Sequence, residues 1–174
     1  RAFAKTKLTT SYGREVSFTT TAKQVDLGSW SLVYNDNITN VASDFITTSF
    51  TIDGMTYFAF ENGSTLYSYD PGLNVFNYEM TNSIFPNSSS VVYNGKAYLF
   101  SLNTIYLFDP KTKSISKLST LNENEIRYNQ SSFLIGDNIY VGLGVASADK
   151  YFKDFWKYNI STNKWTTISP FPGQ

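Results

Sequence analysis

The chain has 174 residues with 14 Lys and Arg against 14 Asp and Glu, so its formal net charge is +0. Because phosphate binding needs clustered cationic side chains, this scatter argues against nucleic acid or an anionic membrane surface as the main partner. The absence of His and Cys excludes Ser–His and Cys–His mechanisms and His- or Cys-ligated metal sites within the chain. No stretch approaches the roughly 18 consecutive apolar residues of a membrane-spanning helix. Aromatic residues make up 17% of the sequence and, with abundant Thr, Ser and Val, favour strands over helices.

The first twenty residues predict a β-hairpin. Polar and apolar residues alternate over 2–6 and again over 15–19, and Tyr12-Gly13 is expected to make the turn. Since an isolated hairpin is marginal in water, we expect residues 1–20 to end a domain that begins before Arg1. This segment resembles the last strands of fibronectin-type-III-like modules in Bacteroidetes-type bacterial surface proteins. That resemblance implies an extracellular or outer-membrane-anchored location, and the alternative is a hairpin lying on the main domain.

A polar linker is expected over 21–27, and a repeat of about 41 residues then organises residues 28–174. Paired strands begin near Ser49, Ser90 and Ser132, which are 41 and 42 residues apart. The third strands of the three units end in Asp-Pro or Asn, and they are Leu66–Asp70, Ile105–Asp109 and Phe155–Asn159. The fourth strands are centred on an aromatic or aliphatic residue, namely Phe76, Ile115 and Trp165. A four-stranded unit of this length is typical of a propeller blade rather than a helical solenoid. Tyr57, Tyr98 and Tyr140 are expected where a blade packs on its neighbour.

The last unit carries the phrases Ile139-Tyr-Val-Gly-Leu-Gly144 and Phe155-Trp-Lys-Tyr-Asn159, and it closes with Lys164-Trp165. These phrases, within 129–173, resemble kelch repeats, although the two earlier units lack the paired glycines and the Trp. The resemblance implies an all-β fold of kelch-type blades at 46–80, 88–119 and 129–169, with a closing strand at 28–34. Because propellers typically have about 4–8 blades, the propeller is expected to be incomplete, its other blades missing from this chain. Self-association of two half-propellers is the alternative.

Carboxylate pairs do not reveal a catalytic site in this sequence. Asp149 and Asp154, like Glu123 and Glu125, are expected to be solvated loop charges, and Asn35-Asp-Asn37 lacks the spacing of a calcium loop. Kelch-type relatives include copper-radical galactose oxidases and sialic-acid mutarotases, but the former use His and a Cys–Tyr cross-link. We therefore predict no catalytic residue, no cofactor and no metal in this chain. The alternatives to a binding protein are the non-catalytic portion of a carbohydrate-active enzyme and a protein-interaction scaffold.

Binding is predicted on the loops that join the strands, since loops on a rigid scaffold tolerate variation. The predicted ligand, a glycan or a protein, would meet aromatic faces together with amide and charged groups before and within the last blade. The candidate residues are Arg127, Tyr128, Asn129, Asp149, Lys150 and Tyr151. The segment 145–153 that carries three of them is expected to be a long polar loop.

Overall fold

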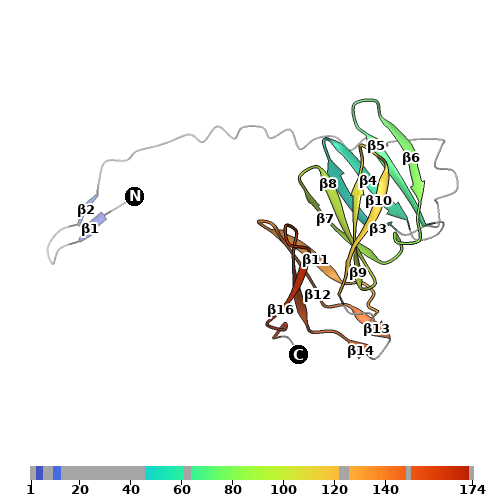
Figure 1. Ribbon diagram of the computed structural model, residues 1–174. Coiled ribbons are helices and arrows are strands. Elements are labelled where there is room, and N and C mark those ends of the chain that lie inside the picture. The colour runs from blue at the N-terminus through green and yellow to red at the C-terminus, as the bar shows by residue number, and fades with distance from the viewer. Residues whose placement is uncertain are drawn as a thin grey trace. The chain divides into compact units, whose positions relative to one another are not determined.

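The computed structural model describes residues 3–5, 10–12, 46–60, 64–121, 126–147 and 150–172 (Figure 1). The chain divides into two compact units, Arg1–Leu32 and Val33–Gln174, which are described separately. The expected linker at 21–27 and closing strand at 28–34 lie outside the described residues. None of the described residues belongs to a helix long and apolar enough to cross a membrane.

In the first unit, β1 (Phe3–Lys5) pairs antiparallel with β2 (Thr10–Tyr12). Phe3 lies opposite Tyr12 and Lys5 opposite Thr10, so the chain reverses between Lys5 and Thr10. Gly13 and the predicted strand over 15–19 lie outside the described residues, so the turn at Tyr12-Gly13 stays a prediction. The intervening residues 6–9 contain neither Gly nor Pro, and so carry no strong turn signal in the sequence. The relation to a fibronectin-type module stays a prediction.

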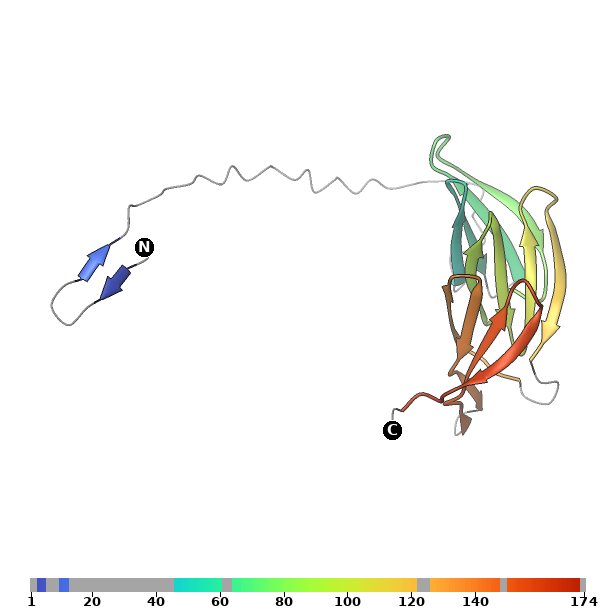
Figure 2. The same cartoon turned by 60° about the vertical axis from the view of Figure 1, so that its left-hand side comes forward.

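The described part of the second unit forms three four-stranded antiparallel sheets, which we call blades 1, 2 and 3 (Figures 1 and 2). Blade 1 consists of β3 (Ile46–Ile52), β4 (Met55–Phe60), β5 (Thr65–Asp70) and β6 (Val75–Thr81). Blade 2 consists of β7 (Ser88–Tyr93), β8 (Lys96–Ser101), β9 (Thr104–Asp109) and β10 (Ser114–Thr120). Blade 3 consists of β11 (Ser131–Ile135), β12 (Asn138–Gly142), β15 (Phe155–Asn159) and β16 (Lys164–Ile168). The prediction of an all-β fold built from four-stranded blades is confirmed.

Recurring polar residues end the strands at the same place in every blade. Asp53-Gly54 and Asn94-Gly95 adopt positive φ between the first two strands of blades 1 and 2, as a tight two-residue hairpin turn requires. After each third strand, a side-chain oxygen accepts a hydrogen bond from a backbone N–H two or three residues on, and these acceptors are Asp70, Asp109 and Asn159. The repeat in sequence is thus a repeat in turn chemistry.

Alternating side chains give each blade two faces, and neighbouring blades pack front to back. We call the face that carries Tyr57, Tyr98 or Tyr140 the front face, and the opposite face the back face. The front of blade 1 packs on the back of blade 2, where the Tyr57 ring meets the Phe108 ring edge-on at 5.4 Å. The front of blade 2 packs on the back of blade 3, where the Phe100 ring lies 5.7 Å from the Trp165 ring. Two apolar cores therefore hold three blades in chain order.

Candidate functional site

A hollow of about 520 Å³ opens where the first strands of the three blades begin. It is lined by the equivalent segments 46–49, 87–90 and 129–132, which the repeat brings together because β7 lies beside both β3 and β11. Every lining residue except Ile46 carries a hydroxyl or amide side chain, and none is charged. The hollow therefore offers neutral donors and acceptors from three consecutive blades.

Asparagine shapes the approach to two of these strands. Asn87 and Asn129 adopt left-handed backbone conformations with φ of 57° and 54°, which Asn tolerates better than most residues. Directly after them, the Ser88 hydroxyl donates to the Phe85 carbonyl at 2.8 Å. The amide of the equivalent Gln130 donates to the Phe100 carbonyl at 2.6 Å and to the Asn87 carbonyl at 3.1 Å. Gln130 thus ties the start of blade 3 to blade 2.

The hydroxyl groups at the two blade junctions differ in their hydrogen bonding. Between blades 1 and 2, Thr48 Oγ1 and Ser90 Oγ lie 2.6 Å apart, and Ser90 also donates to the Ser49 carbonyl at 3.2 Å. At the junction of blades 2 and 3, the positions equivalent to Thr48 and Ser90 are held by Ser89 and Ser132. Their Oγ atoms are buried without a hydrogen-bond partner in the protein, as is Gln130 Oε1. A buried polar group without a hydrogen bond costs about 1–3 kcal/mol of stability. The junction of blades 2 and 3 therefore satisfies its polar groups less completely than the junction of blades 1 and 2.

Beside the hollow, a two-stranded ribbon formed by β13 (Val145–Ser147) and β14 (Lys150–Tyr151) is inserted between β12 and β15. The Tyr128 N–H donates to the Val145 carbonyl at 2.8 Å, and the Val145 N–H donates back to Tyr128 at 2.9 Å. The prediction that 145–153 is a plain loop is therefore wrong in part, because this pairing orders its backbone. Short polar strands of two or three residues give too little alternation to be seen in a sequence.

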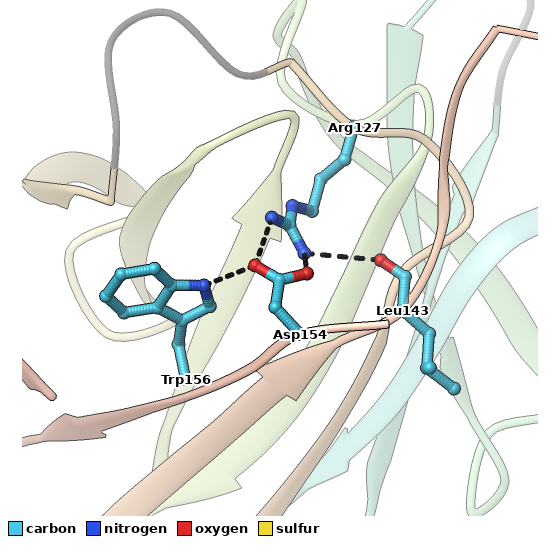
Figure 3. A network of polar contacts seen from close by, with 4 residues as sticks. All are labelled: Arg127, Leu143, Asp154 and Trp156. Atoms are coloured by element: carbon cyan, nitrogen blue, oxygen red, sulfur yellow. Dashed lines mark hydrogen bonds and ion pairs between the residues drawn. The ribbon is translucent and has the colours of Figure 1, made fainter. Parts of the chain in front are cut away.

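An ion pair fixes the segment that leads into blade 3 (Figure 3). The Arg127 guanidinium donates to both oxygens of Asp154, at 3.0 Å and 2.8 Å, and to the Leu143 carbonyl at 3.3 Å. Its Cζ lies 4.1 Å from the centre of the Phe152 ring, and the Trp156 indole N–H donates to Asp154 Oδ2 at 2.5 Å. Burial alone would raise the pKa of Asp154, but hydrogen bonds from Arg127 and Trp156 and the Arg127 charge hold it below its ordinary value.

The structure places the predicted site residues in different environments, some buried and some exposed. Arg127 is fully buried, so it positions the ribbon instead of facing solvent. Asn129 lines the hollow, whereas Tyr128 and Tyr151 are 37% and 69% exposed and Lys150 is exposed on β14. Their role in ligand binding stays a prediction, and Asp149 lies outside the described residues.

Of the four carboxylates in the pairs that the sequence analysis considered, the structure describes only Asp154. Asp154, expected to be a solvated loop charge, instead lies in the ion pair with Arg127. Glu123 and Glu125 lie outside the described residues. Over the described ranges, no group of three Asp and Glu side chains could hold a metal ion.

The lining of the hollow was not predicted from the sequence, apart from Asn129. Its signal is the recurrence of hydroxyl and amide residues at the start of each unit, as in Asn87-Ser-Ser-Ser90 and Asn129-Gln-Ser-Ser132. Such runs are also ordinary in exposed strands and loops. Only the adjacency of three first strands shows that they face one space.

Gly144 is expected to be indispensable to the contact between the ribbon and Tyr128. It has φ +90°, and a Cβ added there would lie 2.6 Å from the Tyr128 carbonyl oxygen. We expect Gly144→Ala to lower the free energy of unfolding in urea by about 2–4 kcal/mol, from backbone strain and this clash. Gly136→Ala is the matched control, because Gly136 has φ +59° but no atom within 4 Å of an added Cβ, and it should cost about 1 kcal/mol. Equal losses for the two variants would contradict the steric argument.

Comparison with known proteins supports a fold and no activity. Searches against protein-family models and curated proteins find no match for this chain. A solved structure titled "Structure of YjhT" is similar, with a TM-score of 0.62 and 16% sequence identity over 72% of this chain and 52% of that chain. The chain therefore spans about half the length of that protein, and at this identity the likeness shows the fold alone. The three blades are accordingly similar in fold to a kelch-like β-propeller.

Proposed function

We propose that this chain is part of a non-catalytic binding protein of the cell surface or the secreted fraction, and that its ligand is a glycan. The observation that carries the proposal is the hollow, which is lined by hydroxyl and amide side chains from three blades and by no charged residue. Sugars carry many hydroxyl groups that both donate and accept hydrogen bonds. The side chains of Ser, Thr, Asn and Gln can also donate and accept, so they can pair with both functions of a sugar hydroxyl.

The ribbon beside the hollow extends this surface. Tyr128 and Tyr151 are exposed there, and aromatic rings offer flat apolar faces against which the C–H faces of sugars pack. The Arg127–Asp154 ion pair and the Tyr128–Val145 backbone bonds hold the ribbon in place before a ligand arrives. Such preorganisation reduces the entropy cost of binding. A protein ligand is the second candidate, because exposed Tyr side chains are also frequent at protein interfaces.

The proposal is tested on a glycan array with the chain and a pair of serine-to-lysine variants. Ser131 is exposed and lines the hollow, so Ser131→Lys places a long charged side chain in it. Ser161 is exposed in the turn between β15 and β16 and is absent from the lining, so Ser161→Lys is the matched control. We expect binding to fall at least tenfold in Ser131→Lys and to persist in Ser161→Lys. If no glycan binds, or if both variants bind as the parent does, the proposed ligand or its place is wrong.

A further inference from the structure

Three oxygen atoms of residues that line the hollow are buried without a hydrogen-bond partner among the described residues, and all three belong to the junction of blades 2 and 3. They are Ser89 Oγ, Gln130 Oε1 and Ser132 Oγ. Ser89 lies on the front of blade 2, opposite Phe100 in the pairing of β7 with β8. Ser132 lies on the back of blade 3, opposite Val141, and Phe100 and Val141 belong to the same core. Each serine therefore faces the neighbouring blade.

Gln130 brings the third oxygen to the same junction. The residue is only 6% exposed, and its amide nitrogen donates to the carbonyls of Phe100 and Asn87. Because Phe100 is the residue opposite Ser89, the carboxamide lies beside the strand pair that carries this serine. The two hydrogen bonds of the nitrogen fix the orientation of Oε1, which can only accept. Since buried polar atoms in proteins are nearly always bonded, the unpartnered oxygens point to a group supplied by a ligand.

The equivalent hydroxyls one blade earlier bond to each other. Thr48 Oγ1 and Ser90 Oγ lie 2.6 Å apart, and Ser90 donates further to the Ser49 carbonyl. Ser89 and Ser132 lack such a bond, so each hydroxyl can turn about its Cα–Cβ bond between staggered positions. Both serines are partly exposed as whole residues and line the hollow. The same repeat positions thus carry a bonded pair at one junction and an unbonded pair at the next.

The donor and acceptor properties of the three oxygens select the group that can complete them. Gln130 Oε1 only accepts, whereas a serine hydroxyl both donates and accepts. A carboxylate also only accepts, so it cannot pair with Gln130 Oε1, and the hollow has no cationic side chain to balance its charge. An ammonium group would be buried without a counter-charge for the same reason. A neutral hydroxyl can donate to Gln130 and accept from a serine.

We propose that the junction of blades 2 and 3 binds one hydroxyl group of a neutral sugar, with Gln130 Oε1 as its acceptor and Ser89 and Ser132 as its other partners. This inference rests on the proposed glycan function and narrows the ligand to neutral glycans. The unpartnered hydroxyls lower the stability of the free protein and are satisfied when the ligand binds. At the junction of blades 1 and 2, in contrast, the equivalent hydroxyls stabilise the fold itself.

Serine-to-alanine variants test the proposal first through stability. Removal of an unpartnered buried hydroxyl breaks no hydrogen bond, so Ser89→Ala and Ser132→Ala should unfold in urea at a midpoint equal to or above that of the parent chain. Ser90→Ala is the matched comparison at the repeat position of Ser132. Its hydroxyl bonds to Thr48 and Ser49, so its urea midpoint should fall. A fall for Ser132→Ala as large as that for Ser90→Ala would show that this hydroxyl is bonded within the protein, which overturns the proposal.

Binding of the same variants is then measured on an array that carries neutral glycans and carboxylate-bearing glycans. We expect the parent chain to prefer neutral glycans, and Ser89→Ala and Ser132→Ala each to weaken this binding about tenfold, as the loss of one hydrogen bond implies. Ser161→Ala is the control outside the hollow and should bind as the parent does. Unchanged binding in both variants, or a preference for carboxylate-bearing glycans, would overturn the proposed contact but leave the glycan function standing. A parent chain that binds no glycan would overturn both proposals.

Discussion

Asp154→Asn is expected to lower the free energy of unfolding by about 3 kcal/mol, because it leaves the buried Arg127 charge without a counter-charge. Urea denaturation at neutral pH measures the loss. The matched control is Lys96→Gln, which breaks an exposed ion pair with Asp109 and should leave the transition nearly unchanged. The double variant Arg127→Met with Asp154→Asn should recover part of the loss, since it removes the unpaired charge. An Asp154→Asn variant as stable as the control would show that Arg127 finds compensation elsewhere.

The ion pair between Arg127 and Asp154 also predicts how the stability of the fold changes at acidic pH. The lowered pKa of Asp154 in the folded chain means that its charge stabilises the fold above its ordinary pKa of about 4. This contribution is lost as the pH falls through the lower pKa of the folded state. The stability difference between the parent and Asp154→Asn should therefore shrink from about pH 4 downward. A difference that stays constant over this range would contradict an ionised Asp154.

Phe108→Ala is expected to cost about 3–5 kcal/mol, because Phe108 is fully buried between two blades. Its ring lies 5.9 Å from the Phe50 ring and 5.4 Å from the Tyr57 ring, so its removal opens a cavity at the centre of the first core. Phe171→Ala is the control, since Phe171 is 51% exposed, and it should change stability by no more than about 0.5 kcal/mol. A small loss for Phe108→Ala would mean that the two blades close over the cavity.

The blades could be predicted because their signals are local. Alternation within a strand, a Gly-containing turn and an Asp-Pro stop each lie within a few residues, and the period of about 41 residues then aligns them. Tyr57 and Tyr98 lie at blade interfaces as predicted, and Tyr140 occupies the same position on the exposed front of blade 3. The pairing of β1 with β2 was not predicted, because residues 6–9 between them contain neither Gly nor Pro.

The site could be predicted only in part because its contacts are made through space. Arg127 and Asp154 are 27 residues apart, and nothing in their neighbourhoods marks them as an ion pair. The prediction therefore placed Arg127 among ligand-binding residues, whereas the fold buries its side chain. The hollow depends on three segments about 41 residues apart, each of which looks like an ordinary strand start. Its lining follows from blade adjacency, which the repeat implies only after the order of the sheets is known.

The front-to-back packing of the blades has a consequence for how such a chain can evolve. The fronts of blades 1 and 2 pack on the backs of blades 2 and 3 in the same way, and β7 contacts the first strands on both sides, β3 and β11. Duplication of a gene segment encoding one unit would therefore insert a new blade whose two faces already fit the blades on either side. Each copy could then change the few residues at its own strand start, as Ile46-Thr-Thr-Ser49 and Asn129-Gln-Ser-Ser132 differ here, while its packing stays intact. The lining of the hollow could thus diversify one blade at a time without redesign of the core.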